Sequence, residues 1–147
     1  MKLKSQSGSQ ILEFALLLPF FLLIIFLIID FGFLAYNKAI ITNASREAAR
    51  QGSILTATPW SAANVAAVAC NFARNSLIST RSGTRTATCS GTADPVIVVL
   101  PNAPPNFNTP ITVQITYVYS GFLTSTTTFL LRVDPWTLAA STRMNRE

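Results

Sequence analysis

Residues 8–29 have the sequence GSQILEFALLLPFFLLIIFLII. From Ile11 to Ile29 this stretch contains one charged residue, Glu13. A helix over the run would rise about 28 Å at ~1.5 Å per residue, which is close to the hydrocarbon thickness of a bilayer. The stretch therefore predicts a membrane-spanning helix. A carboxylate near the start of such a helix is expensive in hydrocarbon, so its presence calls for a partner group.

The apolar run is too long for a removable secretory signal, whose apolar core covers only about 7–15 residues. Aromatic and apolar residues also continue beyond Asp30, as far as Tyr36. We therefore expect a membrane anchor, with Tyr36 at the membrane interface. We expect Asp30 to be a solvated charge where the helix leaves the membrane, with a contact to another subunit as the alternative. Pro19 predicts a kink or a locally loosened turn.

The composition of the whole chain fits a membrane-anchored protein, because half of its residues are hydrophobic and only 12% are charged. The formal net charge of +5 comes from scattered basic residues, so nucleic-acid binding is not predicted. The chain has no histidine, which excludes histidine catalysis and histidine metal sites. We find no nucleophile motif, metal-ligand spacing or phosphate-binding glycine loop, and so predict neither an enzyme nor a cofactor.

The helix is predicted to continue out of the membrane. Tyr36, Ile40, Ala44 and Ala48 recur every four residues in an alanine-rich segment, a spacing typical of one face of a helix. Gly52 is the expected C-terminal cap. The charged residues Glu47 and Arg50, together with Arg46, fit either an ion pair within the helix or one between subunits, and the sequence leaves both open.

A second helix is predicted over residues 59–77, with Thr58 as its N-cap and Pro59 in its first position. Its expected apolar stripe comprises Val65, Val68, Phe72 and, less strictly, Ser76 or Leu77. Residues 79–94 are rich in Ser, Thr, Gly and Arg, which indicates an irregular loop or a weak hairpin.

The remaining sequence is predicted to form strands. Residues 96–100 are a short apolar, β-branched run. Residues 111–119 have a clear period of two, in which Ile111, Val113, Ile115, Tyr117 and Tyr119 alternate with Thr112, Gln114, Thr116 and Val118. Residues 126–133 and 136–144 are two further predicted strands, and the proline-rich stretch 101–110 is a loop. Trp60 and Trp136 are expected to anchor the core rather than to bind a ligand. The predicted class is α+β: a long N-terminal transmembrane helix, then a small domain with one helix and an antiparallel β-sheet.

The membrane topology of the chain determines the redox state of its two cysteines, Cys70 and Cys89. Basic residues flank both ends of the apolar run, so charge alone does not settle the orientation. The short segment before the run has no folded mass to translocate, which favours a cytoplasmic N-terminus. The C-terminal domain would then lie in an oxidising compartment, where a Cys70–Cys89 bridge would add about 3 kcal/mol of stability. Two unpaired buried thiols are the alternative.

Several motif-like fragments follow one another along the chain: Gly8, Glu13-Phe14-Ala15, Leu18-Pro19, Asp30-Phe31-Gly32, and Ala44 to Arg50 with Gly52. In this order and at these spacings they resemble the TadE-like family, the minor pseudopilins of the tight-adherence (Flp) pilus. The resemblance is dense over residues 8–52 and looser beyond, although Leu138-Ala139-Ala140-Ser141 with Arg143 and the closing Arg146-Glu147 are similar to the usual C-terminus of the family. The bulky Phe20, Phe21 and Phe26 depart from the polar helices common in pilins proper.

The resemblance implies a processing step and an assembly contact. In the family a prepilin peptidase cuts after the glycine that matches Gly8, so the mature chain would begin at Ser9. Glu13, followed by Phe14, would then be the fifth mature residue, which in pilins pairs with the new amino terminus of a neighbouring subunit. The residues alone also allow a simpler interpretation, in which Glu13 is a carboxylate at the cytoplasmic interface.

The expected organisation is a leader peptide over residues 1–8, a transmembrane and extended pilin-like helix over 9–52, and a periplasmic α+β domain over 53–147. The expected function is that of a minor pseudopilin in the bacterial inner membrane, and in the pilus at the cell surface if it is incorporated there. Its expected partners are the prepilin peptidase, other pilin or pseudopilin subunits, the inner-membrane assembly platform and membrane lipid. The alternative is a permanently anchored, unprocessed accessory protein of a pilus or secretion system, with a periplasmic binding domain.

Overall fold

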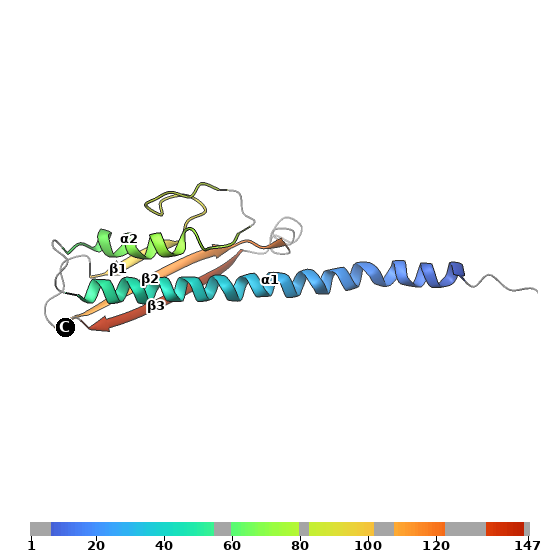
Figure 1. The fold of residues 1–147 in the computed structure, drawn as a ribbon, viewed down its shortest axis with the longest axis horizontal. Coiled ribbons are helices and arrows are strands. Elements are labelled where there is room, and N and C mark those ends of the chain that lie inside the picture. Colours follow the sequence, from blue (N-terminus) through green and yellow to red (C-terminus); the bar gives the residue numbers. More distant parts are fainter. Residues whose placement is uncertain (1–6, 55–59, 80–82, 102–107, 123–134, 146–147) are drawn as a thin grey trace, which may run out of the picture.

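The structure is a computed structural model that describes residues 7–54, 60–79, 83–101, 108–122 and 135–145. A long helix is followed by a short helix and by an antiparallel sheet (Figure 1). The elements are α1 (Ser7–Ser53), α2 (Ala62–Ala73), β1 (Val96–Leu100), β2 (Pro110–Tyr119) and β3 (Trp136–Asn145). This layout confirms the predicted α+β class.

The described sheet has the order β1-β2-β3, with β2 in the centre and both pairs antiparallel. The predicted alternation of β2 is confirmed, because its apolar positions are buried and the positions between them are more exposed. The buried positions are Ile111, Val113, Ile115, Tyr117 and Tyr119. The predicted strand over residues 126–133 lies outside the described residues.

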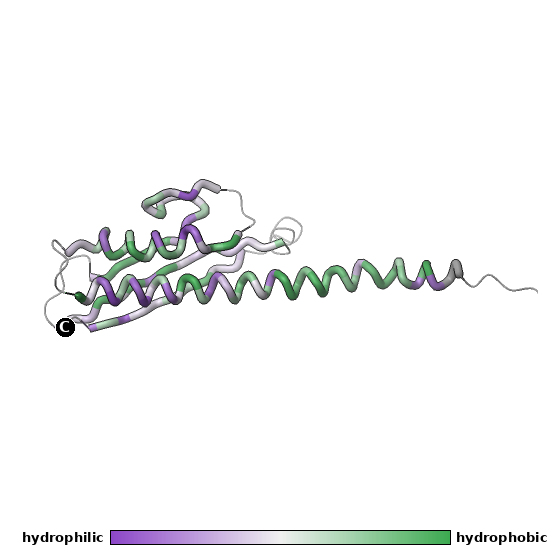
Figure 2. The backbone as a smooth tube through the Cα atoms, in the orientation of Figure 1, coloured by the Kyte–Doolittle hydropathy of each residue, from purple (hydrophilic) through white to green (hydrophobic). Residues whose placement is uncertain are grey.

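Helix α1 has two halves with different surroundings. Every residue from Ile11 to Ile29 is exposed, and this half projects from the domain as a largely apolar helix that the rest of the described chain does not cover (Figure 2). The half that begins at Asp30 lies against α2 and the sheet and buries one face. The buried positions on that face include Asp30, Asn37, Ile41, Ala44 and Ala48. The helix runs through Pro19 without interruption.

Small residues form the contact between α1 and α2. Ala44, Ala48 and Ala49 on α1 and Ala69 and Ala73 on α2 are fully buried members of one core cluster. Side chains of this size let two helix backbones approach closely, and the bulkier residues of β2 fill the remaining space.

Gly52 belongs to this close packing and is not the helix cap that the sequence suggested. Helix α1 continues to Ser53, and a Cβ atom at Gly52 would lie 3.2 Å from Cγ2 of Val65. The glycine therefore packs tightly against Val65 of α2, and its backbone is not in the left-handed conformation of a C-cap glycine.

Helix α2 spans Ala62–Ala73, so it differs from the prediction over residues 59–77 at both ends, and it differs also on its buried face. It begins at Ala62, with Ser61 as the N-cap, whose Oγ accepts a hydrogen bond from the Asn64 amide at 3.1 Å. Thr58 and Pro59 lie outside the described residues. The buried face carries Val65, Ala69, Cys70 and Ala73, whereas Phe72 is 42% exposed. The face of α2 that packs in the core is therefore lined mainly by small side chains, and the Phe72 ring lies outside it.

The two tryptophans have different environments. Trp60 packs against the core, and its Nε1 donates a hydrogen bond to the Gly52 carbonyl at 3.1 Å. Trp136 is 50% exposed, so the expectation that it anchors the core was wrong. It is the first residue of β3 and pairs with Tyr119 at the end of β2, where the domain stops.

Candidate functional site

The projecting half of α1 carries the residues that the sequence marked for processing and assembly. Gly8 and Ser9 lie in the first turn of the helix, and Glu13 and Phe14 are on its exposed surface. Glu13 stands about 26 Å along the helix axis from Asp30, where the domain begins. The structure therefore keeps Glu13 and Phe14 together and places them far from the disulfide Cys70–Cys89 on the domain.

The surface around Glu13 is apolar over the full length of this half. Within the described residues, one helix is long and apolar enough to cross a membrane, and its most apolar window is entirely exposed. A continuous apolar surface of this extent is typical of a membrane or protein interaction site. Its large exposed side chains include Leu12, Phe14, Leu16, Phe20, Phe21 and Ile28.

A buried polar cluster marks the boundary between the two halves of α1. Asp30 is only 7% exposed, and its Oδ1 accepts a hydrogen bond from the Phe122 amide at 2.9 Å. The Tyr119 hydroxyl donates to Oδ1 and to the Asp30 carbonyl, both at 3.3 Å. The expectation of a solvated Asp30 was therefore wrong, because the end of β2 supplies donors that compensate for its burial.

The environment of this cluster shifts the pKa of Tyr119 further above physiological pH. Burial, followed by the nearby charge of Asp30, raises the pKa of Tyr119 to about 12. The phenol therefore remains a donor at physiological pH. The interaction holds the end of β2 on α1 at the residue where the apolar half begins.

Residues 8–50 match the TadE-like protein family. The match confirms the resemblance found in the sequence and supports an association with the tight-adherence (Tad) pilus, whose TadE-like components are structural or accessory proteins. The TadE-like segment contains the projecting half of α1 and most of the half that packs on the domain. No curated protein and no solved structure matches the chain.

The packed half of the TadE-like segment has a second polar contact with the domain. The Asn37 side chain donates from Nδ2 to the Ile78 carbonyl at 2.6 Å and accepts at Oδ1 from the Ile78 amide at 2.8 Å. Asn37 is completely buried. Asp30 and Asn37 are two turns apart on the face that also buries Ile41 and Ala44, and this helical spacing was the available signal for both residues.

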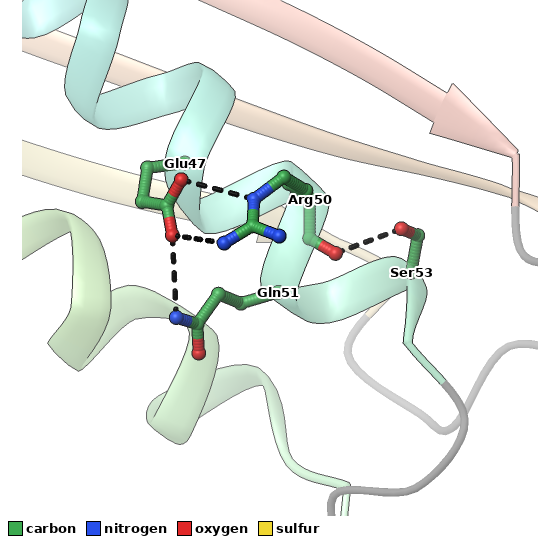
Figure 3. Close-up of polar contacts among 4 residues, drawn as sticks. All are labelled: Glu47, Arg50, Gln51 and Ser53. Atoms are coloured by element: carbon green, nitrogen blue, oxygen red, sulfur yellow. Dashed lines mark hydrogen bonds and ion pairs between the residues drawn. The ribbon is translucent and has the colours of Figure 1, made fainter.

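The charged pair near the C-terminal end of α1 is intrahelical (Figure 3). Arg50 donates to Glu47 from Nη2 at 2.9 Å and from Nε at 3.1 Å, and Gln51 adds a third donor at 3.3 Å. The hydrogen bond from Arg50, followed by that from Gln51, lowers the pKa of Glu47. Of the two interpretations that the sequence allowed, the structure shows the pair within one helix.

The predicted disulfide is present between Cys70, buried on α2, and Cys89 in the loop that follows, with the two Cα atoms 5.7 Å apart. Asp94 organises the same loop by accepting hydrogen bonds from the amides of Thr86 and Gly91, both at 2.8 Å. Burial tends to raise the pKa of Asp94, but these donors outweigh it, and the pKa is lowered. Among the described residues, no group of three or more His, Cys, Asp or Glu side chains is placed to hold a metal ion.

Gly121 provides a test of the polar cluster at Asp30. A Cβ atom at Gly121 would lie 2.6 Å from the Tyr119 hydroxyl and would overlap the Asp30 carboxylate. We expect Gly121→Ala to separate the carboxylate from its donors and to lower the free energy of unfolding by about 1–3 kcal/mol. Thermal unfolding of the full chain in detergent measures this loss.

Gly32→Ala is the matched control, since a Cβ atom there meets no described atom within 4 Å. It should leave the melting temperature unchanged or raise it slightly, because alanine favours a helix over glycine by about 0.5–1 kcal/mol. Equal melting temperatures for Gly121→Ala and the unmodified chain would contradict the structural role of the cluster.

Proposed function

We propose that the protein is a minor pseudopilin of the Tad pilus. In this proposal the helix over residues 9–52 inserts into the inner membrane, a prepilin peptidase removes residues 1–8, and residues 53–147 form a periplasmic domain. The proposal is carried by one observation. The TadE-like segment projects an exposed apolar helix from the domain, and that helix carries a carboxylate at Glu13.

The position of Glu13 supports an assembly role. After cleavage, the new amine at Ser9 would lie one helical turn from Glu13, about 6 Å along the axis. A neighbouring helix displaced along the same axis can bring its own amine to this carboxylate. An amine within about 4 Å would offset much of the cost of placing the carboxylate in hydrocarbon. This pairing therefore favours the one axial alignment of neighbouring helices that brings the two groups together.

The disulfide supports the orientation of the domain. Cys70–Cys89 joins a buried helix position to a surface loop, and such bonds persist in oxidising compartments such as the periplasm. A periplasmic domain puts the short leader, residues 1–8, on the cytoplasmic side. There it is accessible to a membrane-embedded peptidase.

The second candidate function is a permanently anchored, unprocessed accessory protein of the pilus. The observation in its favour is that α1 begins at Ser7, so the Gly8–Ser9 bond lies within the first helical turn. That turn would have to unwind before a protease could cut it. The first turn of a helix lacks part of its internal hydrogen bonding, which makes local opening inexpensive and leaves the pseudopilin as the first candidate.

The mass of the intact protein distinguishes the two functions. We expect the chain purified from its native membranes to lack residues 1–8 when the prepilin peptidase is present and to retain them when it is deleted. Gly8→Val should retain the leader in both strains, whereas the control Gly32→Ala should be trimmed normally. A full-length mass in every strain would favour the accessory protein, with Glu13 as an interfacial charge.

A further inference from the structure

The end of the domain nearest the projecting helix carries two exposed aromatic side chains. Phe122 follows the end of β2, Trp136 begins β3, and each is 50% exposed. Figure 1 shows that the end of β2 and the start of β3 lie at the same end of the domain, beside the point where α1 leaves it.

Phe122 lies at the level of the apolar half of α1. Its ring centroid is 6.4 Å from that of Phe26, which precedes Asp30 by one helical turn and stands about 6 Å farther toward the projecting end. The hydrogen bond from the Phe122 amide to Asp30 holds this arrangement. A residue of the domain is thereby placed against the surface that the membrane would surround.

Trp136 continues the inward-facing positions of β3 beyond the core. Leu138 and Ala140, two and four positions along the strand, are buried against the helices, so Trp136 faces the same side of the sheet. It pairs with Tyr119, whose hydroxyl donates to the Asp30 carbonyl. Trp136 therefore lies near the level of Asp30, where the packed half of α1 meets the projecting apolar half.

We propose that Phe122 and Trp136 form a membrane-contact surface, which seats the domain in the interface of the lipid bilayer before assembly. Amphipathic Trp rings concentrate at the boundary between headgroups and acyl chains, and Phe rings occur on the lipid-facing side of interfacial segments. Trp136 and Phe122 lie at that boundary if α1 spans the bilayer. The surface is continuous with the apolar half of α1, which favours lipid as its occupant. The proposal rests on the membrane insertion included in the proposed function.

The two tryptophans of the chain provide the test and its control. Trp60 donates to Gly52, which stands about 33 Å along α1 from Asp30, so it should remain well outside the bilayer. The full chain would be reconstituted in phosphatidylethanolamine–phosphatidylglycerol vesicles that contain nitroxide-labelled lipids. Trp60→Phe then reports on Trp136, and Trp136→Phe reports on Trp60.

We expect shallow nitroxides to quench Trp136 at least about twofold more strongly than Trp60, because an interfacial side chain lies about 5–10 Å deep. Aqueous acrylamide should show the opposite order. If Trp60→Phe does not fold, the emission of Trp136 and its quenching are obtained by subtracting the emission of Trp136→Phe from that of the unmodified chain. Phe122→Trp in a chain that lacks both natural tryptophans should also be quenched by shallow nitroxides.

Two other outcomes would overturn the proposal. Trp136 quenched by acrylamide and not by lipid would be solvated, whereas Trp136 shielded from both quenchers would be covered by a second copy of the chain. Phe20→Trp, at the centre of the apolar run, separates this failure from that of the proposed function. Strong quenching of Phe20→Trp by deep nitroxides would maintain the membrane span, and its absence would remove the span and the contact surface together.

Discussion

Replacing Glu13 with alanine is expected to leave the protein in the membrane and to abolish its assembly into pili. The substitution removes a charge from an apolar helix, so insertion should be at least as favourable as before. It also leaves the amine of the neighbouring subunit without its proposed partner. Removing one member of a buried ion pair costs about 3–5 kcal/mol, which is more than a hundredfold in an association constant.

The register of the carboxylate can be tested separately from its charge. The double variant Glu13→Ala/Leu17→Glu moves the carboxylate one turn along the same helix face and keeps the net charge constant. Assembly should remain absent, because the carboxylate at position 17 would lie one helical turn away from the amine of the neighbouring subunit. Membrane fractionation and the amount of this protein in purified pili are the two measurements. Normal incorporation of Glu13→Ala would show that Glu13 has no pairing role.

Loss of the Cys70–Cys89 disulfide is expected to be the largest single change in the stability of the domain. A bridge between residues 19 positions apart restricts the unfolded chain by about 3 kcal/mol in the chain-entropy model. For a domain of this size, that corresponds to a fall in melting temperature of roughly 10–20 °C. Thermal unfolding with and without dithiothreitol measures the difference.

The double variant Cys70→Ala/Cys89→Ala provides the control for the reductant. It should melt near the temperature of the reduced protein and should show no further change when dithiothreitol is added. The loop retains the hydrogen bonds of Asp94 to Thr86 and Gly91, so we expect the domain to remain folded at low temperature. A melting temperature unaffected by reduction would mean that the bridge does not restrict the unfolded chain.

The elements were predictable from sequence where a periodic pattern is repeated often enough. The alternation of residues 111–119 and the long helix through Ala44 and Ala48 both depend on local spacing, which is visible in the chain itself. The processing and assembly residues were found through family motifs, and their roles remain proposals. The disulfide had to be inferred from topology, because two cysteines in a sequence do not specify their separation in space.

The errors share a physical cause. Phe72 is more hydrophobic than Ala69, yet the alanine is completely buried and the phenylalanine is 42% exposed, because burial depends on which positions face another element. Gly52 has the position of a cap in the sequence and is used for helix contact in the structure. The burial of Asp30 is compensated by donors from Tyr119 and Phe122, which lie 89 and 92 positions later in the chain. No local sequence pattern reveals such distant partners.

The long helix also determines when the domain can finish folding. Ser45 binds Thr142 across 97 positions, and Lys38 binds the carbonyl of Ala139 across 101, so the packed face of α1 is completed only by β3. During export the helix would enter the membrane well before β3 reaches the periplasm. In the proposed topology, part of the packed face of α1 would lack its cover in that interval, and the chain would be exposed to periplasmic proteases and chaperones. Membrane insertion and completion of the domain would then be separate events in the biogenesis of the protein.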